Sequence, residues 1–310
     1  MRYIKNFINL RERMKSVQNK CIICGSPDWK QFVLTGTFSA VMCKGCSLVY
    51  VNARKDIKSQ TDYFGDIDVS NNNSYYKDFR LRYYNDSLDI LGRFKPEKGN
   101  ILDVGSSFGW FLHAAHEKGW NVAGLEPSKV SISEMKKEYD YDVINASAEN
   151  LNKIKGKYDI ITFWNVLEHI KDPSKALVEC NNKLRNDGVI VIAVPNLEGI
   201  IMRCITYFHR LTLYSFKSEL DRLYQSDNKF MHLYHFSLAT LTRLLEKNGF
   251  KPLIIVRQDI VDPKKIRERL ELDHPKDRLN FIRTFILEIL IRLSHLLNAQ
   301  DELVVYAKKN

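Results

Sequence analysis

Residues 100–126 read NILDVGSSFGWFLHAAHEKGWNVAGLE, and this stretch decides the fold. A short apolar run over 100–105 ends in glycine, a helical pattern follows over 110–118, and a second apolar run covers 121–125. This order predicts two parallel strands joined by a helix. Because ligands of such sheets bind beyond the carboxyl ends of the strands, we expect a binding site at the loop that follows Asp103.

The same alternation continues on both sides of this unit. Helical patterns are expected over 75–94, 130–139, 174–184 and 238–248, and apolar strands over 141–146, 158–165, 189–195, 252–256 and 303–307. Continuous apolar strands that alternate with helices are typical of a parallel sheet buried on both faces. The sequence therefore predicts an α/β protein whose Rossmann-like sheet carries helices on both faces, with insertions at about 197–236 and 259–301.

The loop after the first strand discriminates between cofactors. A dinucleotide fingerprint needs glycine at positions 105, 107 and 110, but Ser107 and Trp110 occupy the last two, and no Gly-Lys-Ser/Thr of a P-loop follows. S-adenosylmethionine (SAM) carries no phosphate and does not need such a loop. Gly105 and Gly109 leave backbone room for its methionine part. Glu126, at the end of the second strand, can accept hydrogen bonds from both ribose hydroxyls; a helix-capping or solvated acid is the alternative.

Three motifs carry a resemblance to a known family. Residues 101–109 (ILDVGSSFG) resemble motif I of class I SAM-dependent methyltransferases, residues 124–128 (GLEPS) the acidic motif that follows it, and residues 163–169 (FWNVLEH) the vLEH motif of the small-molecule branch. The resemblance covers about 75–258 and the final strand. Ser107 departs from the usual glycine, and Ser147 from the usual acid near the adenine amine. The resemblance implies SAM as cofactor, bound by Asp103, Gly105, Ser106, Gly109, Glu126, Ser147, Ala148 and Asn165.

Two histidines are candidate catalytic residues. Transfer of a methyl group to a hydroxyl requires a base that titrates near neutral pH, for which histidine is the usual choice. His169 follows the fourth strand, although it can also serve to cap or orient the next helix. His232 lies in a long segment that can fold over the site. Residues 231–237 (MHLYHFS) are similar to the Glu-His-x-x-Tyr-Phe-Ser signature of deoxysugar C-methyltransferases, in which His232 matches the catalytic histidine. Met231 and His235 depart from it, so O-methylation of a sugar is equally compatible.

Four of the six cysteines form the pattern C-x2-C-x18-C-x2-C: Cys21, Cys24, Cys43 and Cys46. Two such pairs supply four thiolates at tetrahedral geometry, which suits Zn²⁺. Four thiolates leave no open position for chemistry, so a structural zinc is expected, in a small β ribbon over about 18–52. A redox Cys-x-x-Cys and buried unligated cysteines are the alternatives, but a redox site needs only one pair.

Composition excludes several classes of protein. The chain has 310 residues, of which 45% are hydrophobic and 27% charged, so it is globular rather than disordered. Residues 1–20 hold about half of the formal net charge of +10, so the main body is not a strongly basic nucleic-acid platform. No secretory signal and no apolar segment of about 18 residues are visible, which favours a cytoplasmic protein. The amphipathic pattern over 281–297 is expected to dock on the core, with a dimer face or a peripheral membrane contact as alternatives.

These observations predict a basic arm over 1–20, a zinc ribbon over 21–52 and a methyltransferase domain over 75–310, with Met14 as a second candidate start. A zinc ribbon ahead of such a domain resembles enzymes of sugar and cell-surface polysaccharide pathways. That resemblance implies a small-molecule acceptor, namely a saccharide or a nucleotide-linked sugar. The alternatives are an RNA methyltransferase that uses the ribbon and the arm, and a non-catalytic binding module, against which the intact Asp103 and Glu126 argue.

Overall fold

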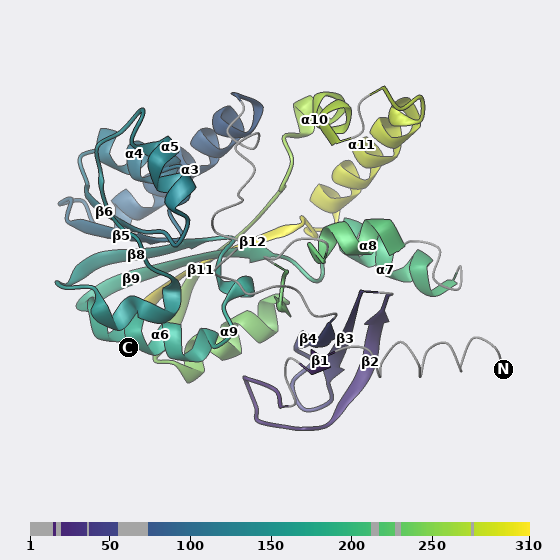
Figure 1. The fold of residues 1–310 in the computed structure, drawn as a ribbon, viewed down its shortest axis with the longest axis horizontal. Coiled ribbons are helices and arrows are strands. Elements are labelled where there is room, and N and C mark those ends of the chain that lie inside the picture. Colours follow the sequence, from purple (N-terminus) through teal and green to yellow (C-terminus); the bar gives the residue numbers. More distant parts are fainter. Residues whose placement is uncertain are drawn as a thin grey trace.

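The central sheet contains seven strands within the described residues, in the order β7-β6-β5-β8-β9-β12-β11 (Figure 1). The computed structural model describes residues 15–16, 20–35, 37–54, 74–211, 217–226, 231–273 and 276–310. The sheet strands are β5 (Asn100–Val104), β6 (Asn121–Leu125), β7 (Asp142–Ile144), β8 (Tyr158–Trp164), β9 (Leu184–Pro195), β11 (Phe250–Gln258) and β12 (Glu302–Lys309).

One strand of this sheet runs against the others. Strands β7 to β9 pair in parallel, whereas β12 is antiparallel to both β9 and β11. The expectation of a parallel sheet is therefore wrong for β12. The segment between β11 and β12 re-enters the sheet at the end of the strands where β11 finishes. Strand β12 therefore runs antiparallel to β9 and β11.

Helices cover both faces of the sheet, which confirms the predicted Rossmann-like fold. In Figure 1, α3 (Ser74–Phe94), α4 (Trp110–Glu117) and α5 (Lys129–Met135) lie above the sheet, and α6 (Pro173–Lys183) and α9 (Leu238–Lys247) lie below it. The sequence explains α9 locally. Leu241, Leu244 and Leu245 recur on one helical face and are fully buried, and each contributes about 1.5–3 kcal/mol of burial free energy. A capping box of Ser237 and Thr240 begins the helix.

A second sheet stands beside the first and is formed by β1 (Lys15–Ser16), β2 (Trp29–Leu34), β3 (Phe38–Cys43), β4 (Val49–Arg54) and β10 (Tyr234–His235). Strand β10 comes from a distant part of the sequence and pairs with β4. On one face, ribbon residues share a core with α6 and α9. Lys247 at the end of α9 donates to the carbonyls of Ile22 and Ile23, each at 2.9 Å. The ribbon is therefore packed against the helices that cover the lower face of the central sheet.

The insertion after β9 packs on the other face of the ribbon. It contains α7 (Ile200–Leu211) and α8 (Lys217–Leu223). Tyr224 stacks on Phe38 with ring centres 4.5 Å apart. The Thr37 hydroxyl donates to Asp221 at 2.6 Å. Ribbon and insertion thus form one unit around a shared apolar cluster.

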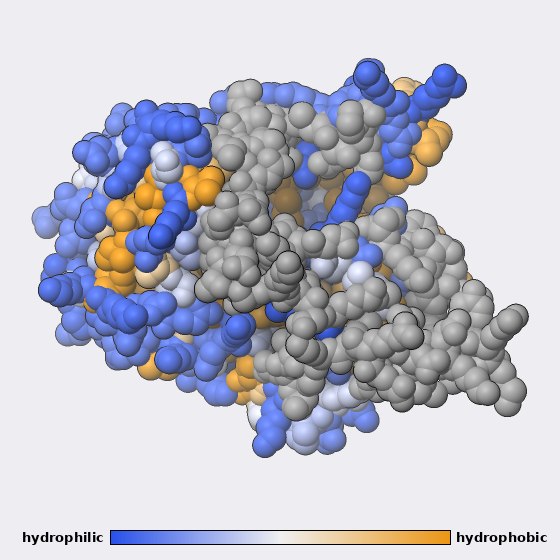
Figure 2. Space-filling model, in the orientation of Figure 1, coloured by the Kyte–Doolittle hydropathy of each residue, from blue (hydrophilic) through white to orange (hydrophobic). Residues whose placement is uncertain are grey.

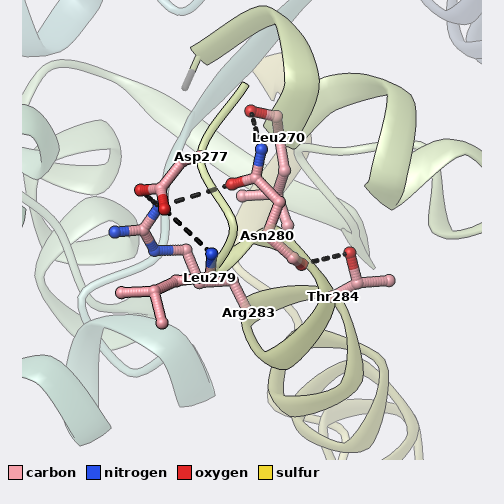
Figure 3. A network of polar contacts seen from close by, with 6 residues as sticks. All are labelled: Leu270, Asp277, Leu279, Asn280, Arg283 and Thr284. Carbon is pink, nitrogen blue, oxygen red and sulfur yellow. Dashed lines mark hydrogen bonds and ion pairs between the residues drawn. The ribbon is translucent and has the colours of Figure 1, made fainter. Parts of the chain in front are cut away.

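The last insertion forms α10 (Ile266–Asp273) and α11 (Asn280–Leu296), which the polar contacts of Figure 3 join. Asn280 of α11 donates to the carbonyl of Leu270 in α10 at 3.4 Å, and Arg283 donates to Asp277 in the connecting segment at 2.6 Å (Figure 3). The expected docking of the apolar face of this segment is wrong for most of its residues, because α11 buries only Asn280, Ile291 and Ser294. Hydrophobic residues lie exposed at this edge of the molecule (Figure 2), among them Phe281, Phe285, Ile286, Leu296 and Leu297.

Short 3-10 helices complete the described elements: η2 (Ala148–Lys153), η3 (Leu167–His169) and η4 (Pro263–Lys265). No helix among the described residues has the length and apolarity needed to cross a bilayer. Most of the basic arm expected over 1–20 lies outside the described residues, and so do 212–216 and 227–230 of the first insertion.

Candidate active site

A cavity of about 630 Å³ opens at the carboxyl ends of β5, β6 and β8. Six residues that the sequence selected line it: Gly105, Glu126, Ser147, Ala148, Asn165 and His169. Its size falls within the range of small-molecule pockets. The cavity therefore lies where ligands of open α/β sheets bind.

The loop after β5 has no room for a side chain at two of its glycines. Gly105 has φ +78°, and a Cβ there would lie 2.5 Å from a methyl carbon of Val166. A Cβ on Gly109, at the N-cap of α4, would lie 2.6 Å from Met135 Cγ. Ser107 adopts φ +48°, a left-handed conformation that favours glycine. Its departure from the family pattern thus falls at a position where the backbone conformation favours glycine.

Glu126 is held by the backbone on both sides. One carboxylate oxygen accepts from the N–H of Ser107 and the other from the N–H of Ser128, each at 2.8 Å. Burial raises the pKa of this carboxyl, and the two backbone N–H groups oppose that rise. Each carboxylate oxygen has two lone pairs, so both can still accept from a vicinal pair of ribose hydroxyls.

Asp103 lies behind the cavity rather than in its lining. It is 2% exposed and accepts from the Thr162 hydroxyl at 2.6 Å. Burial raises its pKa to about 7, and the nearby charge of Glu126 adds to the rise. Ser106 and Gly109 also lie outside the lining. These three residues are placed to shape the loop that borders the cavity.

Asn165 joins the cavity to a buried polar network. Its backbone has φ +56°, and its Nδ2 donates to Glu302 at 2.7 Å. Gln258 donates to the other Glu302 oxygen at 2.7 Å, and Arg80 lies 3.7 Å from Glu302. These contacts fix the orientation of the Asn165 amide at the cavity wall.

The two candidate catalytic histidines lie together, but only one lines the cavity. The rings of His169 and His232 meet edge to face with centres 4.7 Å apart. His232 is buried behind His169, and burial, followed by the charges of His169 and His235, lowers its pKa well below the ordinary value. Glu168 is fully buried beside them, and burial raises its pKa to about 8.

Backbone hydrogen bonds explain how a residue so far along the chain reaches this site. The N–H of His232 donates to Tyr224 at 3.0 Å, the N–H of Leu233 to Glu168 at 2.8 Å, and the N–H of Val51 to Leu233 at 2.9 Å. The segment is therefore clamped between the insertion, η3 and strand β4 of the ribbon.

The four ribbon cysteines converge. The Sγ atoms of Cys21 and Cys46 are 3.3 Å apart, those of Cys24 and Cys43 3.4 Å, and all four lie within 4.8 Å of one another. These separations are too long for disulfides and near the sulfur–sulfur distance of about 3.8 Å around tetrahedral zinc. Burial raises the pKa of the Cys21 and Cys46 thiols, so a cation is needed to keep them as thiolates. The residues fit a zinc ion.

Comparison with known proteins agrees with the fold. A family model described as a methyltransferase domain matches residues 76–254, more than half of the chain. A solved SAM-dependent methyltransferase from Archaeoglobus fulgidus superposes with a TM-score of 0.50 at 19% identity, covering 76% of this chain and 100% of that one. The chain belongs to this methyltransferase family, whose model covers β5 to β9 and most of β11.

Curated relatives share a shorter region. A protein named ubiquinone biosynthesis O-methyltransferase from Coxiella burnetii is 26% identical over 122 residues, which cover 38% of this chain and 50% of the relative. A protein of the same name from Pelagibacter ubique is 29% identical over 133 residues, covering 39% and 54%. The chain thus spans about half the length of the curated relatives it matches.

Sequence reasoning missed part of the lining. Lys171 and Gln225 reach the cavity from the loop after η3 and from the end of α8. Lys171 lies just beyond the 163–169 motif, whereas Gln225 has no motif around it. Glu149 and Asn145 flank the predicted Ser147 and also line the cavity, so their proximity to Ser147 was the available signal. The other missed residues that the argument uses are Ser107 and Val166.

Proposed function

We propose that the protein transfers the methyl group of SAM to a hydroxyl of a small-molecule acceptor, with a sugar or nucleotide-linked sugar as the first candidate. SAM supplies the methyl group as a sulfonium electrophile. The observation that supports this most is that a single cavity is lined at once by Glu126 and by His169. An acid suited to a ribose and an imidazole suited to a reacting hydroxyl thus share one space.

Each lining residue has a role in this proposal. Glu126 accepts from the ribose hydroxyls, and the open loop at Gly105 leaves room for the methionine part. Ser147 and Ala148 border the adenine. Asn165 offers its carbonyl oxygen to the methionine amine or to the acceptor. His169 faces the acceptor hydroxyl, and His232 supports it from behind.

Two observations favour a hydroxyl-bearing acceptor. The curated relatives carry a name that specifies O-methylation. The cavity also includes Lys171, Gln225 and Glu149, whose polar groups suit an acceptor with several hydroxyls. A sugar has this chemistry, and a phenol is the acceptor class against which it must be compared.

The test is methyl transfer from isotopically labelled SAM to a panel of nucleotide sugars, free sugars, phenols and RNA. We expect transfer to a hydroxylated small molecule, and a loss of about 10²–10⁴-fold in rate for His169→Ala with SAM binding retained. His116→Ala, an exposed histidine on α4, is the matched control and should act like the wild type. Transfer to RNA alone, or an unchanged rate in His169→Ala, would contradict the proposal.

We also propose that Cys21, Cys24, Cys43 and Cys46 hold a structural zinc ion. The convergence of their sulfur atoms supports this, and a set of four thiolates has no position left for a substrate. The zinc would stabilise the ribbon, on which the insertion and β10 pack. Elemental analysis of purified protein should find zinc, and its absence from active protein would contradict the proposal.

A further inference from the structure

Glu168, His169 and His232 bring three metal-ligating groups together behind the wall of the cavity. One ligand atom from each lies within 4.8 Å of the other two, and His169 Nε2 is 3.9 Å from Glu168 Oε1. Two ligands that each sit about 2.1 Å from one ion are at most about 4.2 Å apart. The set therefore needs only a slight contraction to close around an ion.

The side chain of Glu168 is fully buried without a hydrogen bond to either carboxyl oxygen from the described residues. The residue is 0% exposed, and neither carboxylate oxygen has a hydrogen-bond partner among the described residues. The guanidinium of Arg80, a nearby cation, lies against Glu302 instead. Without a cation, burial favours the neutral acid, whereas a cation bound beside it would stabilise the carboxylate. Glu168 is aimed at the two histidines, where a cation would supply that partner.

The histidines are oriented as metal ligands are. His169 Nδ1 lies 3.3 Å from the carbonyl of Met231, which turns Nε2 toward Glu168. His232 makes a hydrogen bond to the backbone of Leu223, and its Nδ1 has no partner within the described part of the chain. Ligating histidines in proteins characteristically donate their other ring nitrogen to a carbonyl or carboxylate. Each ring thus has one nitrogen held by the backbone, and the other nitrogen of His169 lies 3.9 Å from Glu168.

We infer that Glu168, His169 and His232 form a binding site for a divalent transition-metal ion at the acceptor end of the cavity. Two imidazoles and one carboxylate are a recurrent ligand set that leaves coordination positions open. His169 is part of the cavity lining and therefore connects this cluster to the cavity. Binding of the acceptor hydroxyl at the open positions rests on the proposed function, whereas binding of the ion does not.

An ion with open positions at this site favours an acceptor that carries two adjacent hydroxyls. Two adjacent hydroxyl oxygens, as in a sugar diol or a catechol, can occupy neighbouring open positions. The reacting hydroxyl, acidified by the ion, loses its proton to solvent. Its oxygen lone pair then forms the C–O bond to the methyl carbon as the C–S bond breaks, and that electron pair stays on sulfur as a neutral thioether. The histidines act as ligands in this account.

The first test is Mn²⁺ binding to the zinc-loaded protein. Binding is measured as the decrease of the free Mn²⁺ signal in electron paramagnetic resonance. Mn²⁺ is a hard ion that four thiolates bind poorly, so the ribbon should not contribute. We expect one Mn²⁺ per chain, with affinity at least about tenfold weaker in Glu168→Gln and His232→Gln. His235→Gln is the matched control. This buried histidine contacts the ring of His232 but is not one of the three proposed ligands, so the variant should bind Mn²⁺ as the wild type does.

Circular dichroism and SAM calorimetry on each variant verify the fold independently. A wild-type protein that binds no Mn²⁺, or a folded Glu168→Gln that binds it equally well, would overturn the inference.

The second test separates the inference from the proposed function. Protein treated with chelator until only the ribbon zinc remains is assayed with a vicinal diol sugar, a catechol and their single-hydroxyl analogues. We expect transfer to be lost, to return with Mn²⁺, and to favour the paired hydroxyls. Full activity without the second ion would overturn the role of the metal and leave O-methylation standing. Mn²⁺ binding without transfer to any hydroxyl would support the site and refute the proposed function.

Discussion

Asp103 and Glu126 are buried acids that lie beside the same loop in space, yet their surroundings differ. Glu126 accepts two backbone N–H groups and lines the cavity, whereas Asp103 accepts one hydroxyl and is enclosed. The sequence predicted a cofactor role for both, because a motif marks a position but not whether a side chain faces the ligand. The two acids therefore call for different measurements.

Asp103 should make the stability of the unliganded protein depend on pH. Burial raises its pKa from 3.8 to about 7, so the stability that its neutral form contributes is complete below pH 3.8 and is lost as the pH rises toward 7. Asp103→Asn keeps an acceptor for Thr162 and removes this titration. Between pH 5.5 and 7, the unfolding free energy of the wild type should fall relative to that variant by about 2 kcal/mol, at about 1.4 kcal/mol per pH unit.

Urea unfolding of both proteins at several pH values between 5.5 and 8 measures this difference. Groups that titrate equally in both proteins cancel, and the difference should level off above pH 7. Parallel stability profiles for the wild type and Asp103→Asn would show that Asp103 does not titrate as its burial requires.

At the scale of elements, local pattern predicted where strands and helices lie but not how they pair. The strand expected over 121–125 and the helix expected over 75–94 match β6 and α3 closely, because apolar runs and helical periodicity are local signals. The reversed direction of β12 has no such signal, since an apolar strand reads alike in either direction. The two-residue strand β10 exists only through its pairing with β4.

The loop between β5 and α4 offers a test at this scale. Gly105→Ala adds a methyl group 2.5 Å from Val166 in a backbone of positive φ, so we expect a loss of about 1–3 kcal/mol in stability and weaker SAM binding. Gly156→Ala is the matched control, because its φ is +89° and nothing lies within 4 Å of the new Cβ. Thermal unfolding and SAM calorimetry compare the two. Equal effects would mean that the contact with Val166 does not matter.

At the scale of the molecule, the ribbon connects parts that the sequence keeps far apart. One of its faces shares a core with α6 and α9, and the other with α7 and α8. Through β10 and Leu233 it also borders the segment that carries His232. The cysteine spacing predicted the ribbon itself, but its attachment depends on tertiary contacts that no motif encodes.

Loss of the ribbon zinc should therefore impair catalysis more than cofactor binding. Cys43→Ser should lower zinc content and reduce methyl transfer at least about tenfold, since metal binding supplies folding free energy to the ribbon that positions His232. SAM affinity should change less, because Glu126 and its loop belong to the central sheet. Cys204→Ser, outside the cluster, is the matched control. Methyl transfer that persists undiminished in zinc-depleted Cys43→Ser would contradict this account.

The central claim is that the cavity binds SAM through the carboxylate of Glu126, and calorimetric titration with SAM tests it most directly. The wild type should bind one SAM per chain. Glu126→Gln should bind about 10–100-fold more weakly, because hydrogen bonds to a charged group contribute about 1.5–3 kcal/mol. Glu149→Gln, an exposed acid on the same cavity, should change the affinity far less. Failure of the wild type to bind SAM, or equal affinity in Glu126→Gln, would contradict the account.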